Sequence, residues 1–450
     1  MPEHMTVMIV DGGARGHVLS ESYENDLCVK RIVVAPGNDF IGHNRQKDVV
    51  IAKDCSLKDP NSLLAVAQKY KPDLVDVAQD DALDLDTVGL LRANGFPAFG
   101  PTRKETIIES SKIWSRGFML EYDIPSPAFA TFSSVDQAVS HLKVEYEKNP
   151  DKLLFQKANG LCGGKGALKS RSLKEGIENV RRMKDFGEAG SCFLIEDGIV
   201  RKDGSTGEEF SYVVITDGKT YQAFKPAQDN KLAENFDKGE QTGGMGANAP
   251  ALVVTRELAN KIKGNIISRA IAGMSKEGRP YVGILYVGGM EADGEPVVIE
   301  FNARPGDPEA QVMWPGVTNY PEMVLKALDG KLDEVRMADD TRYRWCVVGA
   351  SRGYPGPVEK GKRIYGLKEA AKLRGVKIYG AGIAVQDGKF YTNGGRLFSV
   401  VGERYDPLTA RQLAYEAMSY INIEGNNLQF RTDIGWRDTD RFLGNPSIYR

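Results

Sequence analysis

One short stretch, PVVIEFNARPGDPE at residues 296–309, places acidic, amide and guanidinium side chains at alternate positions. Its apolar start predicts a β-strand, and side chains two residues apart on a strand point to the same face. Glu300 and Asn302 therefore share a face, and Arg304 follows them. Mg²⁺ prefers oxygen ligands and commonly combines one or two protein side chains with substrate phosphates. The pattern indicates a metal–phosphate site, although a solvated strand end with an incidental Arg–Glu pair explains the stretch equally well.

Two glycine-rich loops favour the phosphate site. GLCGGKG (160–166) follows an apolar stretch that ends at Lys157, and successive backbone N–H groups in such a loop form an anion-binding nest. A flexible surface turn explains GGKG alone about as well, and the loop lacks the GxxxxGK[ST] spacing of a P-loop. A second glycine-rich loop, TGGMGA, occupies 242–247. The two loops together with the strand-end Glu-x-Asn predict binding of ATP with Mg²⁺.

Composition excludes several other classes of protein. The 450 residues carry a formal net charge of -2, with 41% hydrophobic and 27% charged residues, which is ordinary for a globular protein. No basic patch indicates a nucleic-acid surface, and no apolar run approaches the ~20 residues of a membrane span. The five cysteines are scattered without a CxxC pair, and the four histidines lack metal-ligand spacing. We expect a soluble, cytoplasmic protein with neither nucleic-acid nor membrane partners.

Strands and amphipathic helices alternate over the first hundred residues, which predicts a doubly wound parallel sheet. Ligands of such sheets bind at the carboxyl ends of the strands, where DGGARGH (11–17) and PGND (36–39) fall. One helix is expected over 105–125. A second α/β block follows it, and the segment 228–250 is expected to be a loop. A hairpin then turns at the DG pair of residues 293–294.

The motifs, taken in order, resemble those of the phosphoribosylamine–glycine ligase (glycinamide ribonucleotide synthetase) family. The resemblance covers nearly the whole chain and is carried by GLCGGKG, GEEFS, QDNK, TGGMGA, GILYVGGM, IEFNARPGDPE, TNGGR and DIGWR. It implies an α/β fold (α+β overall) of the ATP-grasp type, with an N-terminal doubly wound pre-ATP-grasp domain and a small C-terminal mixed domain.

The resemblance also implies how the chain is divided. Residues 1–104 would form the N-terminal domain that binds phosphoribosylamine, and 105–125 a linker and helix of the grasp core. Residues 126–196 would form the small lid subdomain and 197–334 the large ATP-grasp subdomain. Residues 335–450 would form the C-terminal domain, which packs on the N-terminal one.

In this family, ATP phosphorylates the carboxylate of glycine, and the amine of 5-phosphoribosylamine then displaces phosphate. The resemblance thus implies ATP, Mg²⁺ or Mn²⁺, and the small molecules glycine and 5-phosphoribosylamine, in a monomer or weak homodimer of de novo purine synthesis. The residues that match the family's ATP site are Lys112, Lys157, Gly163, Gly164, Lys165, Gly166, Glu196 (adenine) and Glu208 (ribose). The metal ligands would be Glu300 and Asn302, and the catalytic residues Asp229, Arg304 and Asp307. The residues that match substrate positions are Gly13, Arg15, Gly37, Asn38, Asp80, Gly243, Gly244, Met245 and Gly246.

Departures from the family pattern concern the amine substrate and the hinge. AQDDALDLD (78–86) stands where the family has GPExPLxxG, so that Asp80 replaces a Glu and further acids follow. These acids are either stabilising at the positive N-terminus of the next helix or indicate a different amine substrate. EDGIVRKDGSTGEE (196–209) is longer than the family's hinge, and we expect its extra residues to form a surface hairpin.

Two alternatives stay open at this point. The first is a related ATP-grasp carboxylate–amine ligase that uses a different amine or acid. The second is a catalytically inactive nucleotide-binding paralogue, against which the retention of Lys112, Lys157, Asp229, Glu300 and Asn302 argues.

Overall fold

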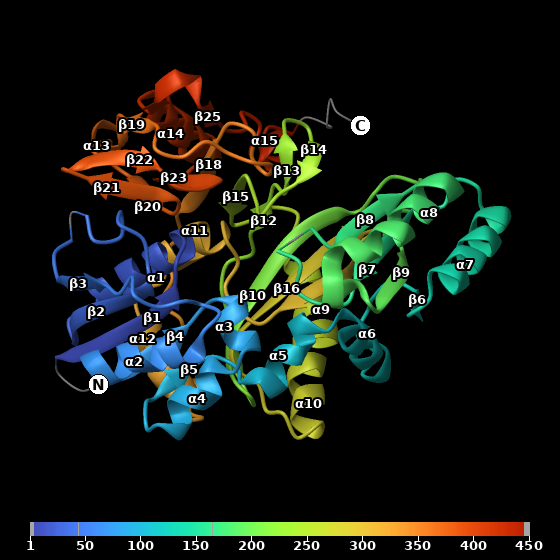
Figure 1. Cartoon of the computed structure of the whole chain (residues 1–450), viewed down its shortest axis with the longest axis horizontal. Coiled ribbons are helices and arrows are strands. Elements are labelled where there is room, and N and C mark those ends of the chain that lie inside the picture. Colours follow the sequence, from blue (N-terminus) through green and yellow to red (C-terminus); the bar gives the residue numbers. More distant parts are fainter. Residues whose placement is uncertain (1–3, 44, 164, 445–450) are drawn as a thin grey trace.

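A five-stranded parallel sheet forms the first part of the chain in the computed structural model, which describes residues 4–43, 45–163 and 165–444 (Figure 1). Its order is β3-β2-β1-β4-β5, and its strands are β1 (Met5–Asp11), β2 (Val29–Pro36), β3 (Asp48–Ile51), β4 (Leu74–Val77) and β5 (Ala98–Phe99). The connecting helices are α1 (Ala14–Glu24), α2 (Pro60–Tyr70), α3 (Asp80–Asp84) and α4 (Thr87–Ala93). The strand order reverses between β1 and β4, so a crevice for ligands opens at their carboxyl ends. This sheet confirms the doubly wound N-terminal part.

The expected helix over 105–125 is two helices, α5 (Arg103–Ser110) and α6 (Lys112–Glu121). Ser111 adopts an extended conformation (φ -126°, ψ 104°) and accepts a hydrogen bond from the N–H of Trp114 at 3.2 Å. A serine at this position competes with the helical ladder by capping the next helix instead. The break therefore starts a new helix at Lys112.

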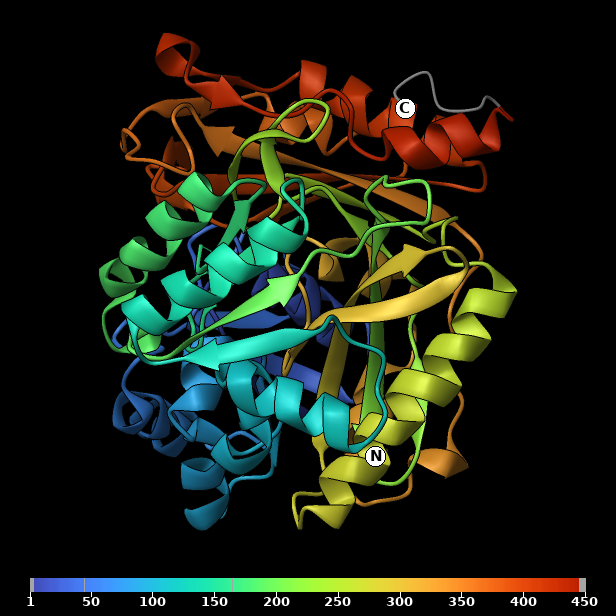
Figure 2. The same cartoon turned by 90° about the vertical axis from the view of Figure 1, so that its right-hand side faces the viewer.

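An antiparallel lid sheet projects from the body of the molecule (Figure 2). Its order is β6-β9-β7-β8, with β6 (Phe129–Phe132), β7 (Leu154–Ala158), β8 (Ala167–Ser170) and β9 (Phe193–Asp197). Helices α7 (Val135–Lys148) and α8 (Leu173–Arg182) pack together against it. Leu142 and Val180 are fully buried between helices and sheet, so the lid has a hydrophobic core of its own.

The central sheet has the order β11-β10-β16-β17, with β10 (Glu208–Asp217), β11 (Tyr221–Ala223), β16 (Val282–Ala292) and β17 (Glu295–Asn302). Alternate residues of β10 enter different cores, because successive side chains of a strand point to opposite faces. Val213 packs with the N-terminal sheet and α12 (Tyr320–Leu328), and Val214 packs with α9 (Arg256–Ile262) and α10 (Ser268–Lys276). Burial on both faces fixes the position of β17 and its polar end.

The segment 228–250, expected as a loop, instead forms four short strands, so that prediction is wrong. They are β12 (Gln228–Asp229), β13 (Leu232–Glu234), β14 (Lys238–Gln241) and β15 (Gly246–Ala249). Strand β15 pairs with β18 (Tyr343–Ser351) over four residues, because its backbone groups find their partners in a distant strand. The glycine-rich loop is thus attached to the C-terminal sheet.

The C-terminal part contains two sheets. The first has the order β12-β15-β18-β23-β20, with β25 (Leu428–Gln429) also on β18, and includes β20 (Val376–Gly380) and β23 (Arg396–Arg404). The second has the order β21-β22-β19-β24, with β19 (Arg363–Tyr365), β21 (Ile383–Gln386), β22 (Lys389–Thr392) and β24 (Asn422–Ile423). Their helices are α11 (Ala310–Met313), which precedes β18, and α13 (Leu367–Ala370), α14 (Pro407–Ser419) and α15 (Trp436–Phe442).

The C-terminal sheets contact the N-terminal sheet through β20. The Asn38 side chain donates to the carbonyl of Gly380 at 3.0 Å, and the N–H of Gly380 donates to Nδ1 of His17 at 3.0 Å. Figure 1 shows the two parts side by side, blue below orange. Within the described ranges, no helix combines the length and apolarity needed to cross a membrane.

A buried carboxylate links the N-terminal sheet to the central part. Asp76 in β4 accepts hydrogen bonds from the hydroxyls of Tyr23 at 2.8 Å and Tyr320 at 2.9 Å, and all three residues are buried. Burial raises the pKa of Asp76 to about 6, against the two tyrosine hydrogen bonds that lower it. The folded protein therefore binds a proton here at pH values where the unfolded chain has lost it.

Asp76→Asn should remove this pH dependence. In the wild-type protein the raised pKa makes the Asp76 contribution to stability fall as pH rises from about 4 to about 6. The free energy of unfolding of the variant, relative to wild type, should therefore increase over that window, by on the order of 3 kcal/mol. Urea unfolding followed by circular dichroism at several pH values measures this, with the exposed Asp54→Asn as control. A constant difference across the window would contradict the assignment.

Candidate active site

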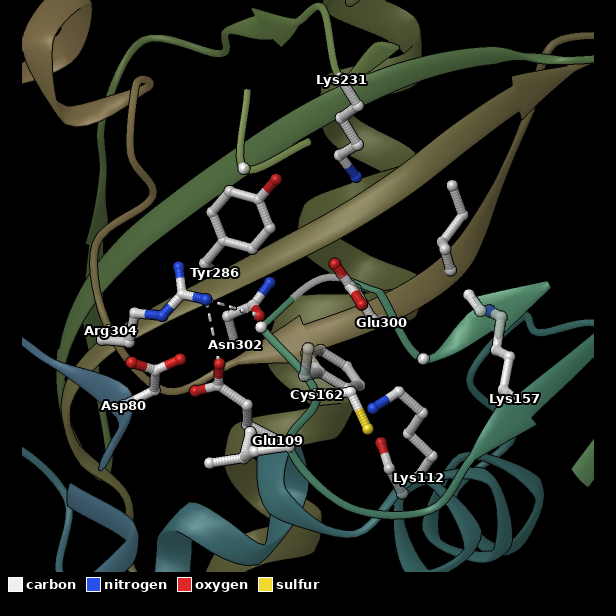
Figure 3. A pocket seen from close by; sticks show the side chains of 18 of the residues that line it. Asp80, Glu109, Lys112, Lys157, Cys162, Lys231, Tyr286, Glu300, Asn302 and Arg304 are labelled. Atoms are coloured by element: carbon white, nitrogen blue, oxygen red, sulfur yellow. Dashed lines mark hydrogen bonds and ion pairs between the residues drawn. The ribbon is translucent and has the colours of Figure 1, made fainter. Parts of the chain in front are cut away.

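A cavity of about 330 Å³ lies where the lid, the central sheet and the starts of α3 and α6 meet (Figure 3). Glu300 and Asn302 enter it from the end of β17, as the two-residue spacing predicts. Lys157 enters from β7 of the lid and Lys112 from the first turn of α6. Residues far apart in the sequence therefore share one enclosed space.

The Glu300 carboxylate is surrounded by cations. Burial alone would raise the pKa of Glu300, but the ammonium groups of Lys231, Lys112 and Lys157 outweigh it and hold the pKa at about 2. Glu300 is therefore ionised at any physiological pH.

The neighbouring amide is bound to a guanidinium. Asn302 Oδ1 accepts from Arg304 Nη2 at 3.3 Å, and the same nitrogen lies 3.1 Å from Glu109 Oε1.

A carboxylate and an amide oxygen on one strand face suit a hard divalent cation. Among the described residues, no group of three or more His, Cys, Asp and Glu side chains is arranged to hold a metal ion. The Glu300–Asn302 pair therefore fits a cation that takes its other ligands from phosphate oxygens and water, as Mg²⁺ does.

The lysine at the lid is held by a buried acid. Lys157 forms an ion pair with Glu196, whose other oxygen accepts from Arg116 at 2.9 Å (Nε) and 2.7 Å (Nη2). Burial lowers the pKa of Lys157, and the Glu196 carboxylate opposes this. The resemblance assigned adenine binding to the backbone around Glu196, and the structure places the Glu196 side chain in this ion pair on the cavity wall.

The cavity position of Lys112 depends on the lid residue Asn159. Asn159 Oδ1 accepts from the N–H of Ile113 at 2.8 Å and from the Ser111 hydroxyl at 3.1 Å. Its carbonyl accepts from the N–H of Lys112 at 3.0 Å. The lid thus caps α6, and Lys112 Nζ reaches the carbonyl of Gly160 at 3.2 Å.

The carboxyl groups of Asp229 and Glu309 lie near each other beside the second glycine-rich loop (242–247). Glu309 accepts from the Tyr286 hydroxyl at 2.8 Å and the Ser211 hydroxyl at 3.1 Å. Asp229 Oδ1 is buried without a hydrogen-bond partner. Burial and the Glu309 charge raise the pKa of Asp229 well above its usual value. A Cβ at Gly244 would lie 2.9 Å from Asp229 Oδ1 and 2.4 Å from Pro308, so only glycine allows this close approach.

A second cavity, of about 560 Å³, lies between the N-terminal sheet and the C-terminal part. Gly13 precedes α1, and Gly37 and Asn38 follow β2, so these residues occupy the expected carboxyl ends of the strands. Asp307 and Arg396 line both cavities. The two spaces therefore meet at this pair.

Most predicted site residues line one of the two cavities. Those at the first cavity are Arg15, Asp80, Lys112, Lys157, Gly163, Gly166, Glu196, Asp229, Gly243, Glu300, Asn302, Arg304 and Asp307. Those at the second cavity are Gly13, Gly37 and Asn38, together with Asp307. Gly164 lies outside the described residues.

Some predicted residues lie away from the place that their match implies. Arg15 lines the first cavity rather than the second, and its buried guanidinium binds Asp11 Oδ2 at 2.6 Å and the carbonyl of Pro305 at 3.1 Å. Glu208 lies outside the lining of both cavities and pairs with Arg441 at 2.6 Å. Lys165 donates to the carbonyl of Pro355 at 3.4 Å. The second glycine-rich loop (242–247) leads away from both cavities. Met245 is fully buried in the C-terminal core, and Gly246 begins β15.

The acids of residues 80–86 do not gather in the second cavity. Asp80 and Asp81 form the first turn of α3, as the capping interpretation predicts. Asp80 faces the first cavity, where burial would raise its pKa but Arg304 and Arg15 lower it. Asp81 lies 3.9 Å from Lys58. Each of these two acids thus has a basic neighbour.

The sequence reasoning assigned no role to several charged residues of the site. Lys231 and Arg396 end the motifs QDNK and TNGGR, which was the available signal for them. Glu109 precedes Lys112 by three residues, and Glu309 ends RPGDPE. Only the fold shows that these positions face the same space.

Comparison with known proteins places this geometry in a family. Phosphoribosylglycinamide synthetase domains match residues 5–109 (N domain), 110–310 (ATP-grasp, or A, domain) and 344–437 (C domain). A phosphoribosylamine–glycine ligase of Vibrio parahaemolyticus is 35% identical over 438 residues, which covers 96% of this chain and 98% of that protein. This chain belongs to the phosphoribosylglycinamide synthetase family.

Relatives of the family also include longer proteins. The trifunctional purine biosynthetic protein adenosine-3 of Bos taurus is 36% identical over 437 residues, and the chain spans 42% of its length. Among solved structures, phosphoribosylamine–glycine ligase of Thermotoga maritima has a TM-score of 0.78 at 27% identity, covering 96% of this chain and 100% of that one. A biotin carboxylase of Campylobacter jejuni has a TM-score of 0.70 at 12% identity and shares the fold. The predicted ATP-grasp fold is confirmed. The cellular compartment and oligomeric state stay predictions.

Glu300→Gln tests whether Glu300 and Asn302 bind a metal ion in this member of the family. The variant keeps the shape of the side chain but removes its charge, so turnover should fall by at least ~100-fold, the loss typical of a preorganised electrostatic group. The Mg²⁺ concentration that gives half-maximal rate should rise. Glu295→Gln, at the exposed start of the same strand, is the control in a steady-state ADP assay. Wild-type turnover and metal dependence in Glu300→Gln would refute the pair as ligands.

Proposed function

We propose that this protein joins glycine to 5-phosphoribosylamine with consumption of ATP, giving glycinamide ribonucleotide, ADP and phosphate in purine biosynthesis. The observation that carries the proposal is the match of all three family domains along the chain. The site supports it through its chemistry: a cation-rich cavity for a triphosphate meets a second cavity beside α1. A family ligase that uses another amine is the alternative outcome of the test.

Phosphoryl transfer needs in-line positioning and neutralisation of charge more than a covalent enzyme group. Lys112, Lys157, Lys231 and Arg304 provide the positive charge from four different segments. Lys157 is paired with Glu196. A triphosphate in the cavity competes for Lys157, and Arg116 still neutralises Glu196 after that exchange.

Glu300 and Asn302 would hold Mg²⁺ or Mn²⁺ at the end of β17. A bound cation there neutralises phosphate charge during transfer to the glycine carboxylate. Arg304 lies beside the pair, with Nη2 at 3.3 Å from Asn302 Oδ1, and can bind a carboxylate or phosphoryl group through two N–H donors.

The second cavity suits a phosphorylated sugar. The backbone at Gly12 and Gly13 leads into α1, and the cavity is also lined by Arg396 and by Lys53, which is paired with Asp39. From there the amine would face the first cavity at Asp307. Its nitrogen attacks the acyl carbon of glycyl phosphate, a C–N bond forms, the C–O bond to phosphate breaks, and phosphate leaves with the electron pair.

The attacking amine loses a proton as the amide forms. Asp229 is suited to accept this proton, because its buried Oδ1 has no hydrogen-bond partner and its side chain lines the first cavity. Burial and Glu309 raise its pKa, which makes its ionised form a stronger base. Ionised Asp229 is the active form, so the rate should increase with pH through that pKa.

Asp229→Asn should lower kcat by about 10²- to 10⁴-fold, the usual contribution of a general base. The acidic limb of the pH–rate profile should disappear, because the group that must ionise is gone. Initial rates between pH 5 and 9 measure both effects. Asp293→Asn, at the exposed β16–β17 turn, is the control. An acidic limb that survives in Asp229→Asn would assign the proton to another group.

Omitting substrates one at a time tests the function itself. ADP release by the purified protein with ATP and Mg²⁺ should require both glycine and freshly generated phosphoribosylamine, and glycinamide ribonucleotide should form in equal amount. Glycine-dependent turnover that ignores phosphoribosylamine would indicate another amine. Absence of ADP with every combination would favour the inactive paralogue.

A further inference from the structure

Arg396 connects three separate segments at the junction of the cavities. Its Nη1 donates to the carbonyl of Gly243 at 2.6 Å and to that of Asp307 at 2.7 Å. Its Nη2 lies 3.4 Å from Asp307 Oδ2. Because the guanidinium is planar and its donors point in fixed directions, one side chain from β23 sets the distance between the glycine-rich loop and the end of the central sheet.

Tyr354 holds the same loop from the other side. Its hydroxyl accepts from the N–H of Gly243 at 3.0 Å. Its ring covers Gly395, where a Cβ would lie 2.4 Å from the ring. Gly243 is thus bound at its N–H by Tyr354 and at its carbonyl by Arg396. We name these two C-terminal residues the loop clamp.

The loop clamp also faces the second cavity. Tyr354 and Arg396 both line it, and Gly243 lines the first cavity. The Asp307 carboxylate lies between them: Oδ1 accepts from Gln311 Nε2 at 2.7 Å, and a Cβ at Gly13 would lie 3.3 Å from Oδ2. A ligand that contacts Arg396 or Asp307 from the second cavity therefore acts on the groups that position the loop of the first.

We propose that the loop clamp couples the two cavities: a phosphoribosyl group in the second cavity fixes Tyr354 and Arg396, which in turn fix Gly243 and Asp307 for transfer of the glycyl group. Arg396 is a positioning residue in this scheme, which rests on the proposed function. The benefit is chemical, because an acyl phosphate that waits for its amine is lost to water. Coupling ties ATP consumption to the presence of the amine.

Arg396→Lys and Tyr354→Phe test the coupling. Lysine keeps the charge but is shorter and lacks the planar fork, so it cannot reproduce both the carbonyl contacts of Nη1 and the carboxylate contact of Nη2. Phenylalanine removes one acceptor. For Arg396→Lys the KM for phosphoribosylamine should rise about 10- to 100-fold, the loss expected for a charged hydrogen bond. The KM for ATP should change less than about twofold, since Lys112, Lys157 and Lys231 are untouched. The amount of ADP released should exceed the amount of glycinamide ribonucleotide formed. Tyr354→Phe should show the same pattern more weakly.

The control is Arg404→Ala at the opposite end of β23, outside the lining of both cavities. It should keep wild-type KM values and equal amounts of ADP and product. Wild-type values in both clamp variants would overturn the proposal. Circular dichroism and gel filtration confirm that each variant is folded.

A second measurement needs no turnover. Ribose 5-phosphate, which lacks the amine, should slow hydrogen–deuterium exchange of the amides of residues 243–246 in the full-length wild-type protein, and the effect should be lost in Arg396→Lys. No protection in wild type would refute the coupling. If wild-type turnover ignores phosphoribosylamine, the proposed function fails, and the exchange experiment still decides whether the cavities communicate.

Discussion

The ionised Glu300 carboxylate is the interaction on which the site depends. Isolated burial of a charge is unfavourable by many kcal/mol, and three lysines from three parts of the chain offset that penalty: Lys112 from α6, Lys157 from the lid and Lys231 from the segment after β12. Two of these lysines also have other acids beside them, since Lys157 pairs with Glu196 and Lys231 lies 3.4 Å from Glu209. Charged groups of the lid, of α6 and of the segment 228–249 therefore converge on one acid at a strand end.

The charges of the first cavity are arranged in pairs that a ligand can divide. Lys157 shares Glu196 with Arg116, so it can leave for a phosphate while Glu196 stays neutralised. Arg304 lies between Glu109 and Asn302 in the same manner. Such sharing neutralises the buried charges without restricting each cation to one partner. The Asp229–Glu309 pair is different, since the two acids repel and the buried Oδ1 of Asp229 has no hydrogen-bond partner. A perturbed carboxyl of this kind in a cavity fits the proton acceptor proposed above.

Local patterns predicted much of this arrangement. The period of a strand was enough to bring Glu300 and Asn302 to one face, and the alternation of strands and helices was enough for the N-terminal sheet. What failed depends on contacts across long sequence distances. The break at Ser111 requires Asn159, 48 residues later, and strand β15 exists because β18 pairs with it. Arg15 was expected in the loops that receive the phosphoribosyl group, and nothing in the sequence indicated that its buried guanidinium binds Asp11 and the carbonyl of Pro305. Lys231 and Arg396 stand at the ends of the motifs QDNK and TNGGR, but only the fold shows that both line the first cavity.

The meeting of Gly13, Asp307 and Arg396 also sets an order of events during translation. Domains generally fold from the N-terminus as the ribosome releases them, so the parallel sheet and the lid emerge long before β23. The nascent chain could then hold nucleotide while the junction is still missing its last member. Only when β23 has left the ribosome exit tunnel does the glycine-rich loop acquire its fixed position. The junction of the two cavities is therefore completed late in synthesis, after the residues of the lid and of the central sheet.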